Sequence, residues 1–317
     1  DLHLERFNAG DHLGAVAEVA RAESISRVLY PADSTEAGQE LRLRQEYFFV
    51  AASLQDLLRR HRNMHTSVLT LGDHAAIQLN DTHPSIAVAE LMRQLVDVYD
   101  VAWDAAWQVT VDTLSYTNHT LLPEALETWP VGLMERMLPR HMQIIYLINA
   151  QHIDSLRAKG IHDFDVLRAV SLIEEDNGRR VRMGNLAFLG SHSVNGVSGL
   201  HTQLMRKTVF AELHKLYPER INNKTNGITF RRWLYQANSE LTSMLVDALG
   251  PDLLDNAEER LLDLEPFAEK PAFRKAFAEQ RLHSKKALAY LIHERLGIAV
   301  NPAAMFDVQV KRIHEYK

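Results

Sequence analysis

The chemistry-bearing residues are densest in residues 311–317, which read KRIHEYK. Arg312 can hold two phosphate oxygens at once and Lys311 supplies a compact positive charge, so the run suits a phosphate-bearing ligand. The apolar residues before it alternate, which predicts a strand over 306–310 that leads directly into Lys311. Ligands gather at the carboxyl ends of strands in open α/β sheets. A solvated surface loop explains the same charges equally well.

Two further polar runs each lie at the start of a predicted helix. Residues 80–84 (NDTHP) join a strand to a helix, where helix capping explains Asp81 and Thr82 as readily as ligand contact does. Residues 115–120 (SYTNHT) form a similar run. There Asn118 and His119 offer hydrogen-bonding groups to a hydroxyl-rich ligand, although a histidine beside a helix start is commonly structural. Both runs therefore stay open between capping and binding.

A third run, residues 224–233 (KTNGITFRRW), combines a turn pair with two arginines and an indole. A hairpin turn with surface arginines would account for it. The alternative is a crossover between domains, in which Asn226 offers an amide to a sugar and Trp233 offers an aromatic face to a planar cofactor. None of the runs has metal-ligand spacing, a glycine-rich phosphate loop or a nucleophile elbow.

The elements that must position these runs are mostly helices. Apolar residues recur at steps of three and four in residues 43–58 and 88–99, which predicts a helix in each range, with Pro84 in the first turn of the second. Further helices are predicted over 200–217 and 273–296. We expect a buried strand over 76–79, and extended segments over 181–197 that are interrupted by Gly184, Gly190 and the turn pair Asn195-Gly196. Strands alternating with helices imply an α/β fold with at least partly parallel sheets, and we place a domain boundary near Asn226-Gly227.

Composition limits the class of protein. The 317 residues are 46% hydrophobic, enough for about two domains, and carry a formal charge of −6 with no basic block, which argues against a nucleic-acid or membrane-surface partner. Cysteine is absent, so a disulfide framework and cysteine-ligated metals are excluded, as in many cytoplasmic proteins. No apolar run is long enough for a membrane span, and we expect a soluble chain. The first residue is Asp1 and the last lies in a polar cluster, so we expect an internal piece of a longer protein.

Taken together in order and spacing, several runs resemble the α-glucan phosphorylases, the glycogen/maltodextrin phosphorylase family. The resemblance covers essentially the whole chain. One departure is Phe230, where the family usually has proline. The runs that carry the resemblance are SRVLYP (26–31), ELRLRQEYF (40–48), LNDTHP (79–84), YTNHTLLPEALE (116–127), LPRH (138–141), VNGV (194–197), TNGITFRRW (225–233) and FDVQVKRIHEYK (306–317).

The resemblance implies a helix-rich α/β fold of the GT-B type, two Rossmann-like domains that are present only in part. Residues 1–226 would be the later part of the amino-terminal domain, on the glucan side, and 227–317 the start of the carboxy-terminal domain, on the cofactor and phosphate side. The implied enzyme is a glycosyltransferase of carbohydrate metabolism, from a family that includes allosteric enzymes. It would catalyse reversible phosphorolysis of terminal α-1,4-glucosyl units to glucose 1-phosphate with retention, as a cytoplasmic homodimer.

The resemblance also implies roles for individual residues. His119 and Asn226 would hold the 6-hydroxyl of the transferred glucose, with Asp81 lining the same pocket. Arg312 and Lys317, with Tyr316 nearby, would bind the substrate phosphate. Lys311 and Trp233 would contact pyridoxal 5′-phosphate, whose phosphate relays a proton. Asp33 lies in residues 31–38, which match a mobile gate over the site.

The lysine that binds this cofactor covalently is expected beyond residue 317, so the isolated chain is expected to be inactive. Two other functions remain open. A sugar-nucleotide-dependent glycosyltransferase can share the GT-B fold, because fold does not fix function. A non-catalytic glucan-binding module would retain glucan without phosphate-dependent chemistry. The sequence does not distinguish glycogen, starch and maltodextrin as substrates.

Overall fold

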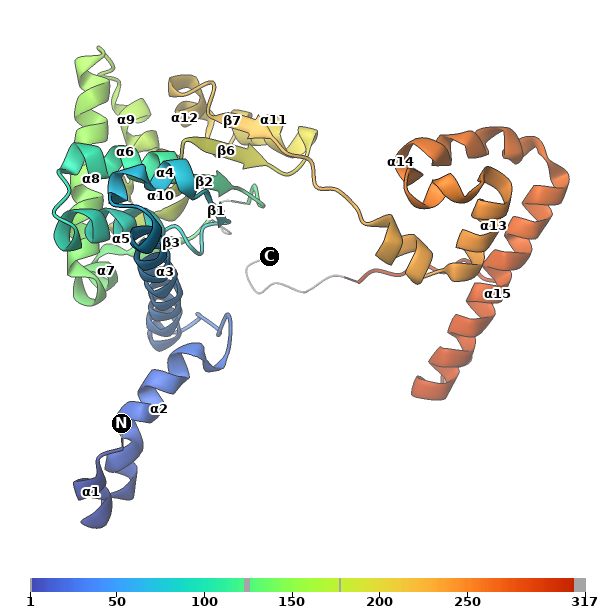
Figure 1. Cartoon of the computed structure of the whole chain (residues 1–317), viewed down its shortest axis with the longest axis horizontal. Coiled ribbons are helices and arrows are strands. Elements are labelled where there is room, and N and C mark those ends of the chain that lie inside the picture. Colours follow the sequence, from blue (N-terminus) through green and yellow to red (C-terminus); the bar gives the residue numbers. More distant parts are fainter. Residues whose placement is uncertain (1, 123–125, 177, 311–317) are drawn as a thin grey trace. The chain divides into compact units, whose positions relative to one another are not determined.

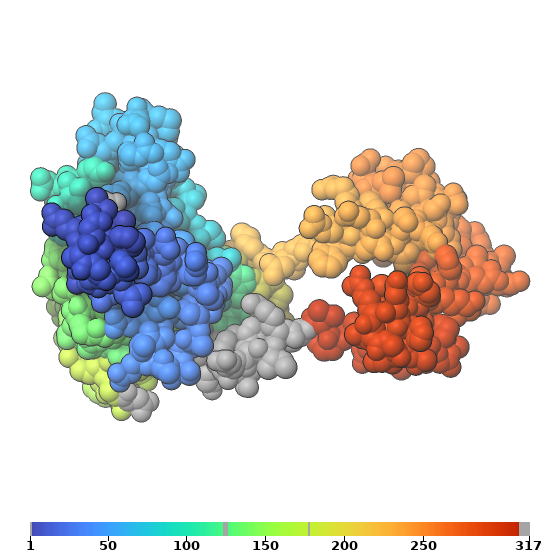
Figure 2. Space-filling view, turned by 90° about the horizontal axis from the view of Figure 1, so that it is seen from below, coloured from blue at the N-terminus to red at the C-terminus, as the bar shows by residue number. Residues whose placement is uncertain are grey.

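The computed structural model describes residues 2–122, 126–176 and 178–310 (Figure 1). The chain divides into two compact units, one of residues 1–225 and one that begins at Asn226. Each is visible as its own packed body in Figure 2, the first in blue to yellow and the second in orange and red. No helix of the described residues is both long enough and apolar enough to span a membrane.

A four-stranded parallel sheet forms the centre of the first unit. Its strands are β1 (Ile77–Asn80), β2 (Leu114–Thr117), β6 (Ser193–Gly196) and β7 (Ile221–Asn223), in the order β1-β2-β6-β7. Helices connect consecutive strands, as parallel pairing requires. A second, antiparallel sheet has the order β3-β5-β4, with β3 at Thr128–Pro130, β5 at Arg180–Arg182 and β4 at Ile173–Glu174. The helix-rich α/β prediction is confirmed.

Three helices show why the sequence folds in this way. Helix α3 (Glu36–Met64) buries the predicted stripe, including Leu43, Leu54 and Leu58. Helix α5 (Ala87–Arg93) is buried from its first residue to Met92 and packs against α3 and α8 (Pro139–Ala158). The first unit also contains α1 (Leu4–Asn8), α2 (His12–Arg27), η1 (Val68–Thr70), α4 (Leu71–His74), the π-helix η2 (Gln94–Val98), α6 (Trp103–Thr113), α7 (Val131–Met137), α9 (Phe164–Val170), α10 (Met183–Leu189), α11 (Gly199–Lys207) and α12 (Ala211–Leu216).

The regular elements of the second unit's described residues are all helices, which lie between Arg231 and Leu296. A small core of Leu245, Leu253 and Ala257 holds its shorter elements together. The predicted helix over 273–296 is confirmed as α15 (Pro271–Leu296), which ends where Gly297 takes a left-handed conformation with φ of 69°. The other elements are the π-helix η4 (Arg231–Gln236), α13 (Ser239–Leu249), η5 (Pro251–Leu254), α14 (Ala257–Arg260) and η6 (Leu261–Glu269).

Five local predictions are wrong. Residues 306–310 form no strand, and Val310 is 91% exposed, because no strand among the described residues of the second unit is there to pair with them. The stretch over 181–197 is not extended throughout: β5 leads into α10, which is buried at every residue and so lacks an amphipathic period. Asn195-Gly196 ends strand β6 and makes no turn.

The other two errors concern helix boundaries. The predicted helix over 200–217 is two helices, α11 and α12, because the backbone leaves the helical region at Thr208 and Phe210 enters the core. Pro84 lies ahead of α5 and not in its first turn. The chain turns between β1 and α5, and the Pro84 carbonyl accepts a hydrogen bond from Ala87 N.

A buried histidine makes the first unit sensitive to acid. His152 on α8 is only 8% exposed, and its Nε2 atom has no hydrogen-bond partner. Burial, together with the nearby positive charges of Arg220 and Lys159, lowers the pKa of His152 from 6.5 to about 4. The unfolded chain therefore binds more protons between these two pH values. This site favours folding fully above pH 6.5 and loses that contribution as the pH falls toward 4.

We expect the free energy of unfolding of His152→Gln to fall less between pH 6.5 and pH 4 than that of the unsubstituted chain, because glutamine does not titrate. In the unsubstituted chain the lost contribution amounts to about 3 kcal/mol, from the size of the pKa shift. Urea midpoints measured at pH 6.5 and pH 4 would test this. His162→Gln, at an exposed histidine, is the control and should leave the pH dependence unchanged. Equal acid sensitivity in all three proteins would contradict the prediction.

Candidate functional site

The carboxyl ends of the parallel strands carry polar side chains in register. Asn80 on β1 is aligned with Thr117 on β2, which is aligned with Asn195 on β6. The Thr117 hydroxyl donates to Asn195 Oδ1 at 2.9 Å and accepts from Gln78 Nε2 at 2.8 Å. Because parallel strands all end at the same edge of a sheet, the residues that follow them collect there. This edge is the candidate functional site.

Two predicted sugar-site residues, Asp81 and His119, lie at this edge. Each follows a strand directly or nearly so, and the backbone N–H of Asp81 donates to the Thr117 carbonyl at 3.0 Å. The exposed His119 ring is hydrogen-bonded through Nε2 to Asn80 Oδ1. Asp81 has a φ of 66°, in the left-handed region that few residues other than glycine adopt. The chain therefore turns sharply at Asp81, and its carboxylate oxygen accepts from Thr82 N at 2.9 Å.

The residue before His119, Asn118, is the centre of a buried set of hydrogen bonds. Asn118 is fully buried, donates to the Tyr116 hydroxyl at 3.2 Å and shares a 2.9 Å hydrogen bond with His201 Nε2. Its backbone N–H donates to the Asn195 carbonyl at 3.0 Å. Helix α11, which carries His201, packs tightly on β6, since a Cβ atom at Gly196 would lie 2.4 Å from Thr202 Oγ1. His201 was not predicted from the sequence, where no local pattern connects it to residue 118.

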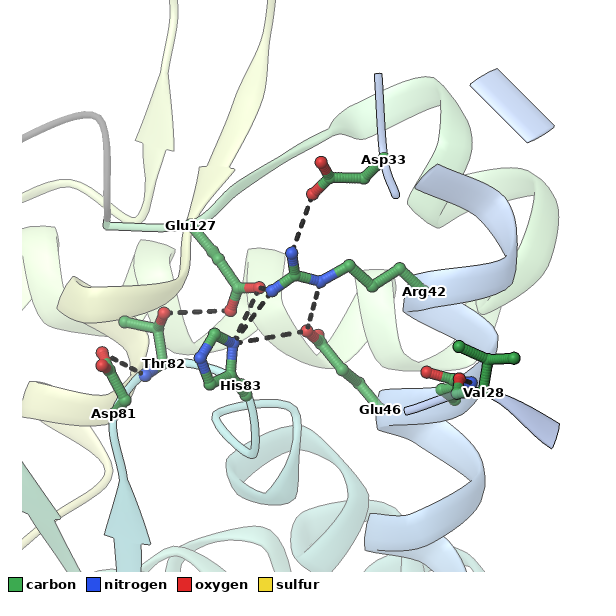
Figure 3. A network of polar contacts seen from close by, with 9 residues as sticks. Val28, Asp33, Arg42, Glu46, Asp81, Thr82, His83 and Glu127 are labelled. Carbon is green, nitrogen blue, oxygen red and sulfur yellow. Dashed lines mark hydrogen bonds and ion pairs between the residues drawn. The ribbon is translucent and has the colours of Figure 1, made fainter. Parts of the chain in front are cut away.

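A second group of charged residues adjoins Asp81 (Figure 3). Arg42 on α3 donates through Nη2 to Glu127 Oε1 at 2.6 Å and through Nη1 to Asp33 Oδ2 at 2.8 Å. His83 Nδ1 lies 3.0 Å from Glu127 Oε1. The Thr82 hydroxyl donates to the second oxygen of Glu127 at 2.9 Å. The network thus joins the predicted gate residue Asp33 to the turn that follows β1.

Glu46, a buried residue of α3 whose Oε1 lies 3.9 Å from His83 Nδ1, differs from Glu127 in its electrostatics. Burial by itself would raise the pKa of Glu127, but the hydrogen bond and charge of His83, with help from Arg42, lower it to about 2. Burial and the charge of Glu127 instead raise the pKa of Glu46 well above its ordinary value. For His83, burial lowers the pKa, and the contact with Glu127 outweighs it and raises the pKa overall.

The geometry of Glu46, His83 and Glu127 would also allow three ligand atoms to converge on a metal ion. The Arg42 guanidinium already supplies a positive charge there, 2.6 Å from Glu127 and 3.1 Å from His83. A cation would therefore meet an existing cation. We assign the cluster to an ion-pair network instead.

Arg42, Glu46 and Glu127 were not among the residues predicted for the site. A signal for two of them exists in the sequence: Arg42 and Glu46 are four residues apart and directly flank the apolar stripe of α3. Opposite charges at that spacing and that position indicate a pair held at the edge of the core. Glu127 is far away in the sequence, and only the fold brings it to Arg42.

Of the remaining predicted residues, two are among the described residues, and both belong to the second unit. Asn226 and Trp233 belong to the second unit, where Asn226 is exposed and Trp233 on η4 is 74% exposed. Lys311, Arg312, Tyr316 and Lys317 lie outside the described residues. Their roles stay predictions.

Comparison with known proteins decides the family. A family model described as carbohydrate phosphorylase matches residues 1–317. The chain belongs to this family. The glycogen phosphorylase of Haemophilus influenzae is 49% identical over 315 residues, which are 99% of this chain and 38% of that protein. The glycogen phosphorylase of Synechocystis is 48% identical over 314 residues, 99% of this chain and 37% of that protein.

The similarity extends to animal members of the carbohydrate phosphorylase family. The brain form of human glycogen phosphorylase is 46% identical over 325 aligned residues, which cover 100% of this chain and 38% of that protein. The chain thus spans well under half the length of the phosphorylases it matches. Its family was correctly predicted from the sequence, and the helix-rich α/β structure with a parallel sheet agrees with part of a GT-B phosphorylase fold.

Proposed function

We propose that this chain is part of a glycogen or maltodextrin phosphorylase that uses inorganic phosphate to release glucose 1-phosphate from terminal α-1,4-glucosyl units. The observation that carries the proposal is the similarity to glycogen phosphorylases along the whole chain, at 46–49% identity. The sheet edge supports it, because Asp81 and His119 lie there together on the ends of neighbouring strands. A hydroxyl-rich sugar suits such an edge, which offers several donors and acceptors.

In this proposal the chain's residues hold the sugar and the phosphate in place for an attack with retention. The His119 imidazole and the Asn226 amide bind the 6-hydroxyl, while the His119 backbone carbonyl stabilises positive charge that develops at the anomeric carbon. Asp81 lines the pocket on the side of the anomeric substituent. Arg312 and Lys317, with Tyr316 beside them, bind the attacking phosphate. The phosphate can protonate the glycosidic oxygen, so the paired carboxylates of a glycoside hydrolase are not required.

Pyridoxal 5′-phosphate is the proposed cofactor of the whole protein. Its fit can be judged at Trp233, whose largely exposed indole on η4 is free to cover a planar ring. Lys311 is proposed to contact the cofactor phosphate. When bound, the cofactor supplies a phosphate group that exchanges a proton with the substrate phosphate. We propose that the lysine that holds it covalently lies beyond this chain.

The two proposed domains would divide this work. We assign residues 1–226 to the glucan side of a GT-B enzyme and residues 227–317 to its cofactor and phosphate side. We also propose that the whole protein is a cytoplasmic homodimer, for which the absence of cysteine from this chain is in keeping with a reducing compartment.

The proposal is tested by incubating the full-length protein with an α-1,4-glucan, with and without inorganic phosphate. Glucose 1-phosphate should form only when phosphate is present. Glucan binding without this reaction would instead support a binding module. Glucosyl transfer that needs a sugar nucleotide would support the alternative glycosyltransferase.

Substitution of Arg312 should specifically weaken the use of phosphate. A guanidinium can make two parallel hydrogen bonds to a phosphate and an ammonium cannot, so Arg312→Lys keeps the charge but loses the paired geometry. In the full-length protein, the apparent KM for phosphate should rise about tenfold, a loss on the order of one charge-assisted hydrogen bond, while that for glucan changes little. Unchanged phosphate dependence combined with weaker glucan binding would place Arg312 outside the phosphate site.

A further inference from the structure

The segment of residues 28–35 is attached to α3 by few contacts. Arg42 Nη1 donates to Asp33 Oδ2 at 2.8 Å, and Gln45 Nε2 donates to the Val28 carbonyl at 2.6 Å. Its last residue, Thr35, caps α3 by accepting from Gly38 N at 3.1 Å. Most of the segment is exposed, and Tyr30 has a φ of 55°, which is unfavourable for a bulky residue. The Tyr30 ring also lies against this network: its centroid is 5.9 Å from the Arg42 guanidinium carbon and 5.3 Å from the His83 ring centroid. Arg42 is therefore a contact of both the Asp33 and the Tyr30 side chains of a strained segment.

Arg42 has a hydrogen-bond donor that this arrangement leaves unused. Its two terminal nitrogens are bound to Asp33 and to Glu127, whereas its buried Nε has no hydrogen-bond partner. Glu46, only 9% exposed, lies beside it with both carboxyl oxygens likewise unpartnered. Arg42 Nε and Glu46 Oε1 are 3.8 Å apart, an ion-pair distance that is too long for a hydrogen bond. Buried groups are rarely left unpaired, so the vacant donor and acceptor need an explanation.

The balance of charge around Arg42 explains why these two groups are unpaired. Glu127 has a pKa of about 2 and is ionised, while burial and the charge of Glu127 raise the pKa of Glu46, which favours the neutral acid. With Asp33 in place, Arg42 is then paired with two carboxylates. If Asp33 moves away, Arg42 loses one of its two carboxylate partners. Ionisation of Glu46 would then give Arg42 a second carboxylate again. The other charged groups that face Glu46 are His83 and Glu127, which contact each other whether or not Asp33 is present.

We propose that Arg42 is a positioning residue that holds the Asp33 segment against α3, and that Glu46 replaces Asp33 as its counter-ion when the segment moves away. In the exchange, the Asp33–Arg42 pair breaks, Glu46 releases its proton to water, and the Glu46 carboxylate accepts a hydrogen bond from Arg42 Nε. The inference rests on the proposed function and on the prediction, made from the family resemblance, that residues 31–38 form a mobile gate over the sugar site. It adds that Arg42 and Asp33 hold the gate in place, and that the Glu46 carboxylate replaces the charge of Asp33 when the gate opens.

The absence of cysteine allows a direct measurement on the chain. A nitroxide attached to Ser34→Cys reports the mobility of the segment by electron paramagnetic resonance. Arg42→Gln should raise the ratio of mobile to immobile label about tenfold, as expected for loss of a charge-assisted hydrogen bond. Arg44→Gln is the matched control, because Arg44 is on the same helix but pairs with Glu40. Equal label mobility in these two variants would overturn the proposal.

A second variant covers the case in which Arg42→Gln does not fold. Asp33→Asn breaks the same contact from its half-exposed side and leaves the buried residues intact. It should mobilise the label to a similar extent. An immobile label in folded Asp33→Asn would also overturn the proposal.

The exchange of counter-ions predicts a direction for the pH dependence. Because opening releases a proton from Glu46, the mobile fraction should grow as the pH rises from mildly acidic to mildly alkaline. Glu46→Gln cannot ionise and should abolish this trend. If the mobile fraction of Glu46→Gln rose with pH as strongly as that of the unsubstituted chain, Glu46 would not be the group that releases the proton. Since the label measures no catalysis, a positive result together with absent phosphorolysis in the full-length protein would contradict only the proposed function.

Discussion

Replacing Glu90 with glutamine should lower the free energy of unfolding of the first unit by about 3–5 kcal/mol, the usual cost of breaking one side of a buried ion pair. Glu90 lies on the buried face of α5 and is fully inaccessible. Its carboxylate accepts from Arg93 Nε at 2.8 Å and from Gln94 Nε2 at 2.8 Å, and His141 Nε2 lies 2.5 Å away. Glutamine keeps the shape but leaves the cationic Arg93 without its counter-charge.

The loss is measured as the shift in urea midpoint, followed by tryptophan fluorescence. Three of the four tryptophans lie in the first unit, so a Trp233→Phe background restricts the signal to that unit. Glu40→Gln is the matched control. Glu40 also binds two arginines, Arg44 and Arg136, but at the surface, where an ion pair contributes about 1 kcal/mol or less. Similar midpoint shifts in both variants would show that the buried position of Glu90 has no special effect.

The same network predicts an acid limit to stability. Burial alone would raise the pKa of Glu90, but the hydrogen bonds from Arg93, His141 and Gln94 lower it from 4.5 to about 2. A carboxyl group whose pKa is lower in the folded state contributes stability that is fully present above pH 4.5 and is lost as the pH falls toward 2. Glu90→Gln should remove this part of the acid sensitivity. It should leave the separate decline between pH 6.5 and 4, which originates at His152.

In the full-length protein, Asn226→Ala should reduce phosphorolysis by about tenfold to about a hundredfold, since a hydrogen bond lost inside a polar site costs on the order of 1–3 kcal/mol. This prediction rests on the proposed function, in which the Asn226 amide binds the 6-hydroxyl of glucose. Folding should be nearly unchanged, because Asn226 is exposed in the second unit and its side chain makes no hydrogen bond among the described residues. The measurement is kcat/KM for phosphorolysis, with urea midpoints as the folding control.

A donor sugar without its 6-hydroxyl distinguishes this role from others. The unsubstituted protein should already use the 6-deoxy donor poorly, so Asn226→Ala should add little further loss. Equal losses with both donors would assign Asn226 another role. His119→Asn serves as a comparison, because His119 is proposed to bind the same hydroxyl and should show the same reduced loss with the 6-deoxy donor.

The sequence alone was sufficient for the long elements of this protein. The stripe of α3 and the length of α15 follow from local periodicity, which tertiary contacts merely complete. The family was also determined by sequence, because many short motifs in a fixed order are specific even where each one is not. Asp81 could be selected as a polar residue just past a predicted strand, and His119 as part of a similar polar run beside a predicted helix start.

Tertiary structure decided the features that depend on long-range contacts. α10 is buried on every side and carries no amphipathic period, so its helical character is not visible in the sequence pattern. The alternating residues 306–310 do not become a strand, because alternation shows only that a segment could pair and a strand forms only where a partner is present.

The network around Arg42 depends on the fold for the same reason. Arg42 meets Glu127 across 85 positions of the sequence, and Asn118 meets His201 across 83. No local pattern encodes such pairs. The pKa values of Glu46 and Glu127 diverge only because burial and a shared arginine act on both carboxyl groups at once. Residue types and their spacing thus determined which groups are available for chemistry, and the packing of distant segments determined which of them meet and how each is charged.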